Sequence, residues 1–206
     1  MDHFVSHRDA IRPYLAELNA VLDVMPHREI DTVVQALLTA YDNDRIVFIA
    51  GNGGSAATAS HFANDLAKAT IVPGQRRFRV IALTDNVPLL TAWANDSAYA
   101  DVFAEQLEPL IRPGDVFIAI SGSGNSSNIL RAVDVARMSG AVVIGLTGFD
   151  GGKLRDRCDH SIHVPCSVMA QVEDAHLIIQ HAICLYLREV IANAEQYAVS
   201  SAAADG

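Results

Sequence analysis

The chain has 206 residues, of which 50% are hydrophobic and 19% charged, and its formal net charge is −9. These values indicate a globular chain with a sizeable core. The acidic balance, with only two lysines, argues against nucleic acid as a partner, because phosphate backbones attract clustered positive charge. We see no membrane span and no secretory leader, and three cysteines fit reduced thiols. We therefore expect a cytoplasmic protein.

The chain opens with two predicted helices and then alternates between strands and helices. Apolar residues recur at helical spacing over 3–24 and 27–44, and Pro26 separates the two segments. Five apolar runs predict strands at 45–50, 78–83, 115–120, 141–146 and 160–164. Between and after them we expect helical segments at 55–69, 86–95, 99–112, 126–139, 151–157 and 168–194.

The strand runs are continuously apolar rather than alternating, which indicates burial on both faces. An α/β fold follows, with a parallel sheet sandwiched between helices as the middle of three layers, preceded by two N-terminal helices. We expect a single domain over 1–198. The last residues, 199–206, form an Ala/Ser-rich tail that we expect to be disordered.

Two glycine- and serine-rich turns follow two of the predicted strands. The first runs from Gly51 through Asn52, Gly53 and Gly54 to Ser55. Each turn leads into a helix, so its backbone amides and hydroxyls can bind an anion. In parallel sheets ligands sit beyond the carboxyl ends of the strands, so the two turns can line one crevice.

The second turn covers residues 121–126, with Ser121, Gly122, Ser123 and Ser126 as candidate phosphate-binding residues. Such turns are also common as plain connections, and one serine is an ordinary helix cap. Capping needs one hydroxyl whereas this turn offers three, which favours a phosphorylated ligand. Neither turn matches a P-loop or a complete dinucleotide fingerprint.

Further polar residues lie at helical spacing. His61 and Asp65 are four residues apart and share a helix face, which suits a metal or a proton-transfer pair, although a surface contact would look the same. On the last helix Glu173 pairs about equally well with His176 or His181. Spacing alone leaves both histidines open. Two histidines with two carboxylates are a plausible zinc site.

Three motifs in order resemble the sugar isomerase (SIS) fold and, within it, the phosphoheptose isomerase branch. They are the first turn with its helix (51–63), the second turn with its preceding strand end (120–126), and the segment 146–153, Leu-Thr-Gly-Phe-Asp-Gly-Gly-Lys. The resemblance covers nearly the whole chain. It implies a five-stranded parallel sheet flanked by helices and a homotetramer with active sites at subunit interfaces.

The resemblance also implies the roles of individual residues. Phosphate-holding serines fall on Ser55, Ser121, Ser123 and Ser126, and sugar-pocket residues fall near Asn52 and Asp96. The zinc-binding and catalytic positions of the family fall on His61, Asp65, Glu173 and His181, one zinc per subunit. The resemblance thus selects His181 over His176, which we expect to be structural.

This sequence departs from the pattern of the branch at four positions. Asp65 stands where the family has its catalytic glutamate, and Glu173 stands where it has a glutamine ligand. Ala69 replaces an arginine one turn after the carboxylate, and Ala170 replaces a pocket aspartate. We expect the fold and the phosphate site to survive these changes.

The implied reaction is an aldose–ketose isomerisation through an enediol, from sedoheptulose 7-phosphate to a D-glycero-D-manno-heptose 7-phosphate type of product. We assign Asp65 as the base and His181 as the acid. An isomerase for another sugar phosphate remains open, since the fold does not specify the sugar. So does a non-catalytic SIS protein that senses sugar phosphates or binds the replication initiator protein, because segments 83–87 and 91–96 resemble that relative.

Overall fold

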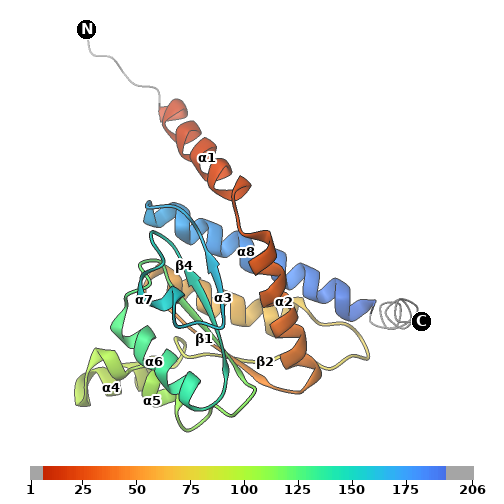
Figure 1. Cartoon of the computed structure of the whole chain (residues 1–206), viewed down its shortest axis with the longest axis vertical. Coiled ribbons are helices and arrows are strands. Elements are labelled where there is room, and N and C mark those ends of the chain that lie inside the picture. The colour runs from red at the N-terminus through yellow and green to blue at the C-terminus, as the bar shows by residue number, and fades with distance from the viewer. Residues whose placement is uncertain (1–6, 194–206) are drawn as a thin grey trace.

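A five-stranded sheet organises the computed structural model, which describes residues 7–193 (Figure 1). All neighbouring strands pair in parallel, in the order β2-β1-β3-β4-β5. This confirms the predicted α/β class and the five-stranded parallel sheet. The strands are β1 (Ile46–Ala50), β2 (Arg79–Ala82), β3 (Val116–Ser121), β4 (Val142–Thr147) and β5 (His160–His163).

The helices follow the predicted order with two differences. They are α1 (His7–Asp23), α2 (His27–Asp42), α3 (Gly54–Asn64), the π-helical η1 (Asp65–Ala69), α4 (Val87–Asp96), the 3-10 turn η2 (Tyr99–Asp101), α5 (Ala104–Leu107), α6 (Ser127–Met138), α7 (Gly152–Arg155) and α8 (Met169–Ala192).

The first difference is that the predicted helix 55–69 widens into the π-helix at Asp65, a candidate site residue, where π segments are often found. The second is that 99–112 is not one helix. Only η2 and the four-residue α5 form there, and Pro109, which has no amide to continue the ladder, accounts for the end of α5. The predicted tail 199–206 lies outside the described residues.

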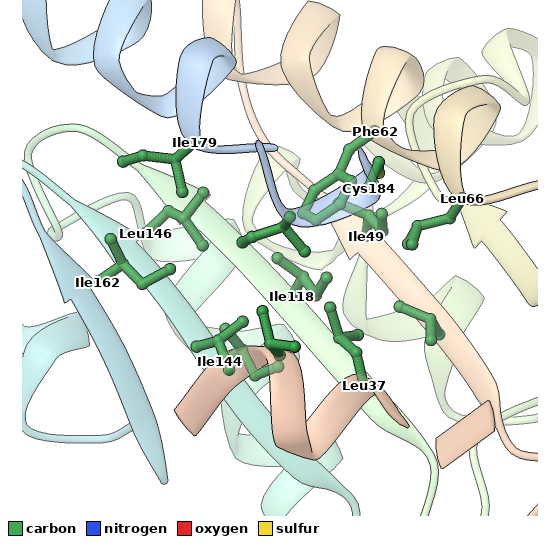
Figure 2. Packing of buried hydrophobic residues seen from close by; sticks show 14 of the residues in the cluster. Leu37, Ile49, Phe62, Leu66, Ile118, Ile144, Leu146, Ile162, Ile179 and Cys184 are labelled. Atoms are coloured by element: carbon green, nitrogen blue, oxygen red, sulfur yellow. The ribbon is translucent and has the colours of Figure 1, made fainter. Parts of the chain in front are cut away.

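The helices cover the sheet in two layers. On one face α2, α3 and α8 pack against it, and Figure 2 shows Leu37, Phe62 and Ile179 from these helices around Ile118 and Ile144 of the strands. On the other face lie α4, α5, α6 and α7. Every residue of β3 is buried, as its unbroken apolar run predicts for a central strand.

Among the described helices, α8 alone is long and apolar enough to cross a membrane, judged by length and composition only. Its apolar face, which includes Val172, Ile179, Ile183 and Leu187, belongs to the core between α2, α3 and the sheet. Packing in the core accounts for this face of α8, whereas other apolar residues of the helix, such as Leu185, are exposed. This arrangement also places the polar residues of α8 beside α3.

One polar residue of α8, His176, is enclosed in this core. Its side chain is fully buried, and Nε2 lies 3.2 Å from the carbonyl oxygen of Thr147, to which it can donate its proton. Burial lowers the pKa of His176 from 6.5 to about 4, although the Thr147 hydrogen bond acts in the opposite direction. The histidine is structural, as the sequence analysis expects, and neutral at pH 7.

The lowered pKa of His176 predicts a loss of stability in acid. Between pH 6.5 and about 4 the unfolded chain binds a proton on this histidine and the folded chain does not, so stability is complete above pH 6.5 and falls as the pH drops. At pH 5 the loss from this residue should be roughly 2 kcal/mol. Urea unfolding at pH 7 and pH 5, with wild type and His176→Gln, measures it. An equal pH-dependent loss in both proteins would contradict the assignment.

Candidate active site

The first strand-end turn leads directly into α3. After β1 ends at Ala50, the chain turns through Gly53, whose φ of +57° favours glycine, and α3 begins at Gly54. Its cap position is a glycine, which supplies no side-chain cap. The amides of its first turn can donate to a bound anion, with the helix dipole adding to the attraction.

The second turn connects β3 to α6 and carries the predicted hydroxyls. Ser126 occupies the cap position of α6, yet its side chain makes no capping hydrogen bond. Its Oγ instead lies 3.1 Å from Oγ of Ser121, and Ser123 Oγ accepts a 3.3 Å hydrogen bond from the amide of Asn125. Helix capping therefore does not explain these serines, whose hydroxyls remain available as donors to a ligand.

Hydrogen bonds between two asparagines join the two turns. Asn52 Nδ2 donates to Oδ1 of Asn128 at 2.9 Å, and Asn128 Nδ2 donates back to Oδ1 of Asn52 at 2.8 Å. The hydroxyl of Tyr99 donates to the same Asn52 oxygen at 2.9 Å, and Asn128 Oδ1 also accepts from the amide of Ile129. Because both side-chain amides are hydrogen-bonded in this way, they hold the turns that follow β1 and β3 in a fixed relative position.

Between the two turns lies a cavity of about 260 Å³. Most of its walls offer backbone amides, hydroxyls or side-chain amides. Glu173 is the charged residue among the described residues that line it. The lining consists of Asn52, Gly53, Gly54, Ser55, Ile120, Ser121, Gly122, Ser123, Ser126, Met169 and Glu173. The structure thus brings together all but one of the residues predicted to bind substrate.

The exception is Asp96, the last residue of α4. It is exposed, accepts a 2.8 Å hydrogen bond from Nδ2 of its neighbour Asn95, and is not part of the cavity wall. In the single chain it therefore stands apart from the other predicted binding residues.

The carboxyl group of Glu173 lies against the backbone of Gly54. A Cβ atom at position 54 would come within 2.4 Å of the carboxyl carbon and both its oxygens, so this approach requires glycine. The contact is at the N-terminus of α3, where the helix dipole favours negative charge. Glu173 therefore places a negative group at the same helix end that a ligand phosphate would use.

Further along the chain, three side chains from α3, η1 and α8 converge. Nε2 of His61 lies 3.4 Å from Oδ2 of Asp65, and Nε2 of His181 lies 3.5 Å from the same oxygen. The two imidazole nitrogens are 3.3 Å apart. The side chains of His61 and His181 are 43% and 44% exposed, whereas that of Asp65 is 14% exposed. The carboxylate of Asp65 is therefore the most buried member of the group, and the two imidazoles lie on its solvent side.

This group fits a zinc ion. One atom from each of His61, Asp65 and His181 lies within 4.8 Å of the other two, and two imidazoles with one carboxylate are a usual zinc ligand set. Three protein ligands leave a coordination position open. Glu173, the fourth predicted ligand, is not a member of this group and lines the cavity instead.

Three residues of this region were not predicted from the sequence. Asn128 and Tyr99 anchor Asn52, and the buried Gln180 donates from Nε2 to Oδ2 of Asp65 at 3.4 Å. Asn128 could have been predicted, because a polar residue in the first turn of a helix that follows a predicted anion-binding turn can face the same crevice. Gln180 gave a weaker signal, as a polar residue at a position that the helical period of α8 assigns to the core.

Comparison with known proteins agrees with this geometry. The family model described as "SIS domain" matches residues 13–148. The chain belongs to the SIS domain family. This SIS chain is 39% identical over 166 residues to the phosphoheptose isomerase of Aneurinibacillus thermoaerophilus, covering 80% of this chain and 82% of that protein.

Two other proteins are similar to this chain. The structure of phosphoheptose isomerase GmhA from Neisseria gonorrhoeae superposes with a TM-score of 0.81 at 32% identity, over 89% of this SIS chain and 99% of that chain. Lincomycin biosynthesis protein LmbN of Streptomyces lincolnensis is 43% identical over 145 residues, covering 66% of this chain. The match spans 53% of LmbN, about half of its length.

The position of Glu173 predicts the effect of its charge on anion binding. In the metal-free protein, Glu173→Gln should bind inorganic phosphate at least about ten-fold more tightly than wild type, because a like charge at the end of α3 is removed. Isothermal titration calorimetry in the presence of a chelator measures this. Glu29→Gln makes the same change of net charge on α2, outside the cavity, and should leave the affinity unchanged. Equal or weaker phosphate binding by Glu173→Gln would contradict the prediction.

Proposed function

We propose that the chain is an aldose–ketose isomerase of the phosphoheptose isomerase type, which converts sedoheptulose 7-phosphate to a D-glycero-D-manno-heptose 7-phosphate type of product. One observation carries the proposal. The same two helices, α3 and α8, contribute both to the hydroxyl-lined cavity and to the group of His61, Asp65 and His181. The names and coverage of the isomerase relatives support the same activity.

The cavity is suited to the phosphate group of the substrate. Ser55 and Ser121 are both buried in its wall, at 5% and 4% exposure, and Ser123 and Ser126 add hydroxyls that no helix cap uses. Neutral donors and a helix N-terminus are sufficient to hold a phosphate. Binding the phosphate there fixes one end of the sugar and leaves its carbonyl end to be oriented by other residues.

The His–Asp–His group is suited to the proton transfers. An isomerisation through an enediol needs a base to remove a proton from the carbon beside the carbonyl and an acid to return one to the neighbouring carbon. Asp65, partly enclosed, is the proposed base, and His181, 3.5 Å from its Oδ2, is the proposed acid.

Zinc is part of this proposal, at one ion per subunit. His61, Asp65 and His181 would hold it, with Glu173 as a further candidate ligand from the cavity wall. When bound, the ion would polarise the carbonyl and hydroxyl oxygens of the sugar. If the proposal is right, the purified protein contains near-stoichiometric zinc by elemental analysis, and His61→Ala loses it. A metal-free wild type after purification without chelators would contradict the zinc assignment.

An isomerase for a different sugar phosphate is the second candidate. It is favoured by the similarity to a protein named for lincomycin biosynthesis, and by Glu173 and Asp65, where the branch has glutamine and glutamate. The phosphate cavity and the proton-transfer pair would serve either sugar. A panel of ketose phosphates assayed under one set of conditions separates the two candidates.

The role of Asp65 as the base gives the direct test of the isomerase. Asp65→Asn keeps the size of the side chain but cannot accept the proton, so turnover of sedoheptulose 7-phosphate should fall at least about 10²-fold, within the usual contribution of a general base. Inorganic phosphate affinity should be unchanged because the cavity is intact. A coupled assay and calorimetry on the same samples measure both. Wild-type turnover in the variant would refute the assignment.

We further propose a homotetramer. The apolar stripe of α1 has no cover within the described part of the chain, since Ile11 and Leu15 are 63% and 51% exposed. In Figure 1 this helix extends away from the sheet, and polar contacts from Tyr14 and Glu17 connect it to the start of α8. Subunit contacts would bury this stripe and stabilise the helix.

The double variant Ile11→Asp with Leu15→Asp should therefore dissociate the assembly. Light scattering after gel filtration should give about four times the chain mass of 22.1 kDa for wild type and a smaller multiple for the variant. Far-ultraviolet circular dichroism is the control for folding. A folded variant that remains a tetramer would show that α1 is not the contact.

A further inference from the structure

The buried amide of Gln180 reaches the oxygen on which the active-site group converges. Gln180 lies on α8 immediately before His181, and its side chain is fully buried. Its Nε2 donates to Oδ2 of Asp65 at 3.4 Å. This is the same oxygen that faces Nε2 of His61 and Nε2 of His181. Three nitrogen atoms from two helices therefore surround one carboxylate oxygen.

The oxygen end of the Gln180 amide indicates that this glutamine lowers the stability of the fold. Its Oε1 is buried and has no hydrogen-bond partner among the described residues. A buried acceptor without a partner destabilises a protein by about 1–3 kcal/mol. The neighbouring face of α8 is apolar, with Ile179, Ile183 and Cys184 in the core. A leucine would suit this position better, so core packing does not explain the glutamine.

The contact with Asp65 does account for it. The amide can face the carboxylate only with its N–H₂ end, because its oxygen would be repelled. A short aspartate side chain turns readily about its last torsion, and Asp65 also begins the π-helical segment η1, where the regular helix ladder is interrupted. A donor fixed in the core beneath Oδ2 selects the rotation that directs this oxygen to the two histidines.

We propose that Gln180 is a positioning residue that holds Oδ2 of Asp65 toward His61 and His181. The importance of this orientation for metal binding and proton transfer rests on the proposed function. Partners that orient a metal ligand through a hydrogen bond typically change metal affinity or activity 10- to 100-fold when removed. Gln180 makes no hydrogen bond to the described residues that line the phosphate cavity. Binding of the phosphate should therefore not depend on it.

The variant Gln180→Leu tests the inference, with Gln180→Met as a second, unbranched replacement if leucine does not pack. Gln171→Leu is the matched control, because Gln171 is another buried glutamine of α8 that contacts Glu17 and Cys166 instead of the His–Asp–His group. Zinc affinity by chelator competition, kcat and KM for sedoheptulose 7-phosphate, and the thermal midpoint are measured for each protein. A crystal structure of Gln180→Leu reports the rotation of Asp65.

A positioning role predicts zinc affinity and kcat about 10- to 100-fold lower in Gln180→Leu, an unchanged KM, and a thermal midpoint equal to or above that of wild type, while Gln171→Leu keeps wild-type zinc affinity and kcat. Asp65 should be turned away from the histidines in the crystal. Unchanged zinc affinity with a lowered thermal midpoint, or Asp65 unmoved, would overturn the inference. If wild type neither binds zinc nor turns over the sugar, the proposed function fails by itself, and the rotation of Asp65 in the variant still decides the role of Gln180.

Discussion

The parallel pairing of β1 with β3 is the constraint on which the site depends. The register Ala50↔Ala119 aligns the two strands so that the glycine turn after one and the serine turn after the other emerge side by side. The reciprocal hydrogen bonds of Asn52 and Asn128 then join the turns. Neither turn encloses the cavity alone, so the proposed anion site depends on the sheet topology and lies where ligands generally bind in such folds.

Helices α3 and α8 connect the cavity to the group of His61, Asp65 and His181. Because α3 begins at the first turn and α8 packs beside it, each helix carries one residue set at the cavity and another set a few turns along. Glu173 is the residue at which the two functions oppose each other. Its negative charge at the end of α3 discourages phosphate, but it is also well suited to a cation. If the protein binds zinc as proposed, the metal and the sugar phosphate are expected to influence each other's affinity.

Much of this could be predicted from the sequence, because its signals are local. The apolar strands, the two turns and the His61–Asp65 spacing depend on neighbouring residues, and the structure places the turns in one cavity wall. Long-range features were beyond such reasoning. The contact of Gln180 with Asp65 joins residues 115 positions apart, and the exclusion of Glu173 from the His–Asp–His group depends on the packing of α8. The end of α5 within segment 99–112 was locally signalled by Pro109 and was missed.

The measurement that tests the account most directly is proton NMR of sedoheptulose 7-phosphate incubated with the zinc-supplemented protein in deuterium oxide. An enediol reaction at Asp65 and His181 removes a proton from the carbon beside the carbonyl and returns one from a group that exchanges with solvent. The account predicts a heptose 7-phosphate that carries deuterium at the carbon next to its carbonyl. Recovery of the ketose phosphate, unlabelled and unconverted, would contradict it.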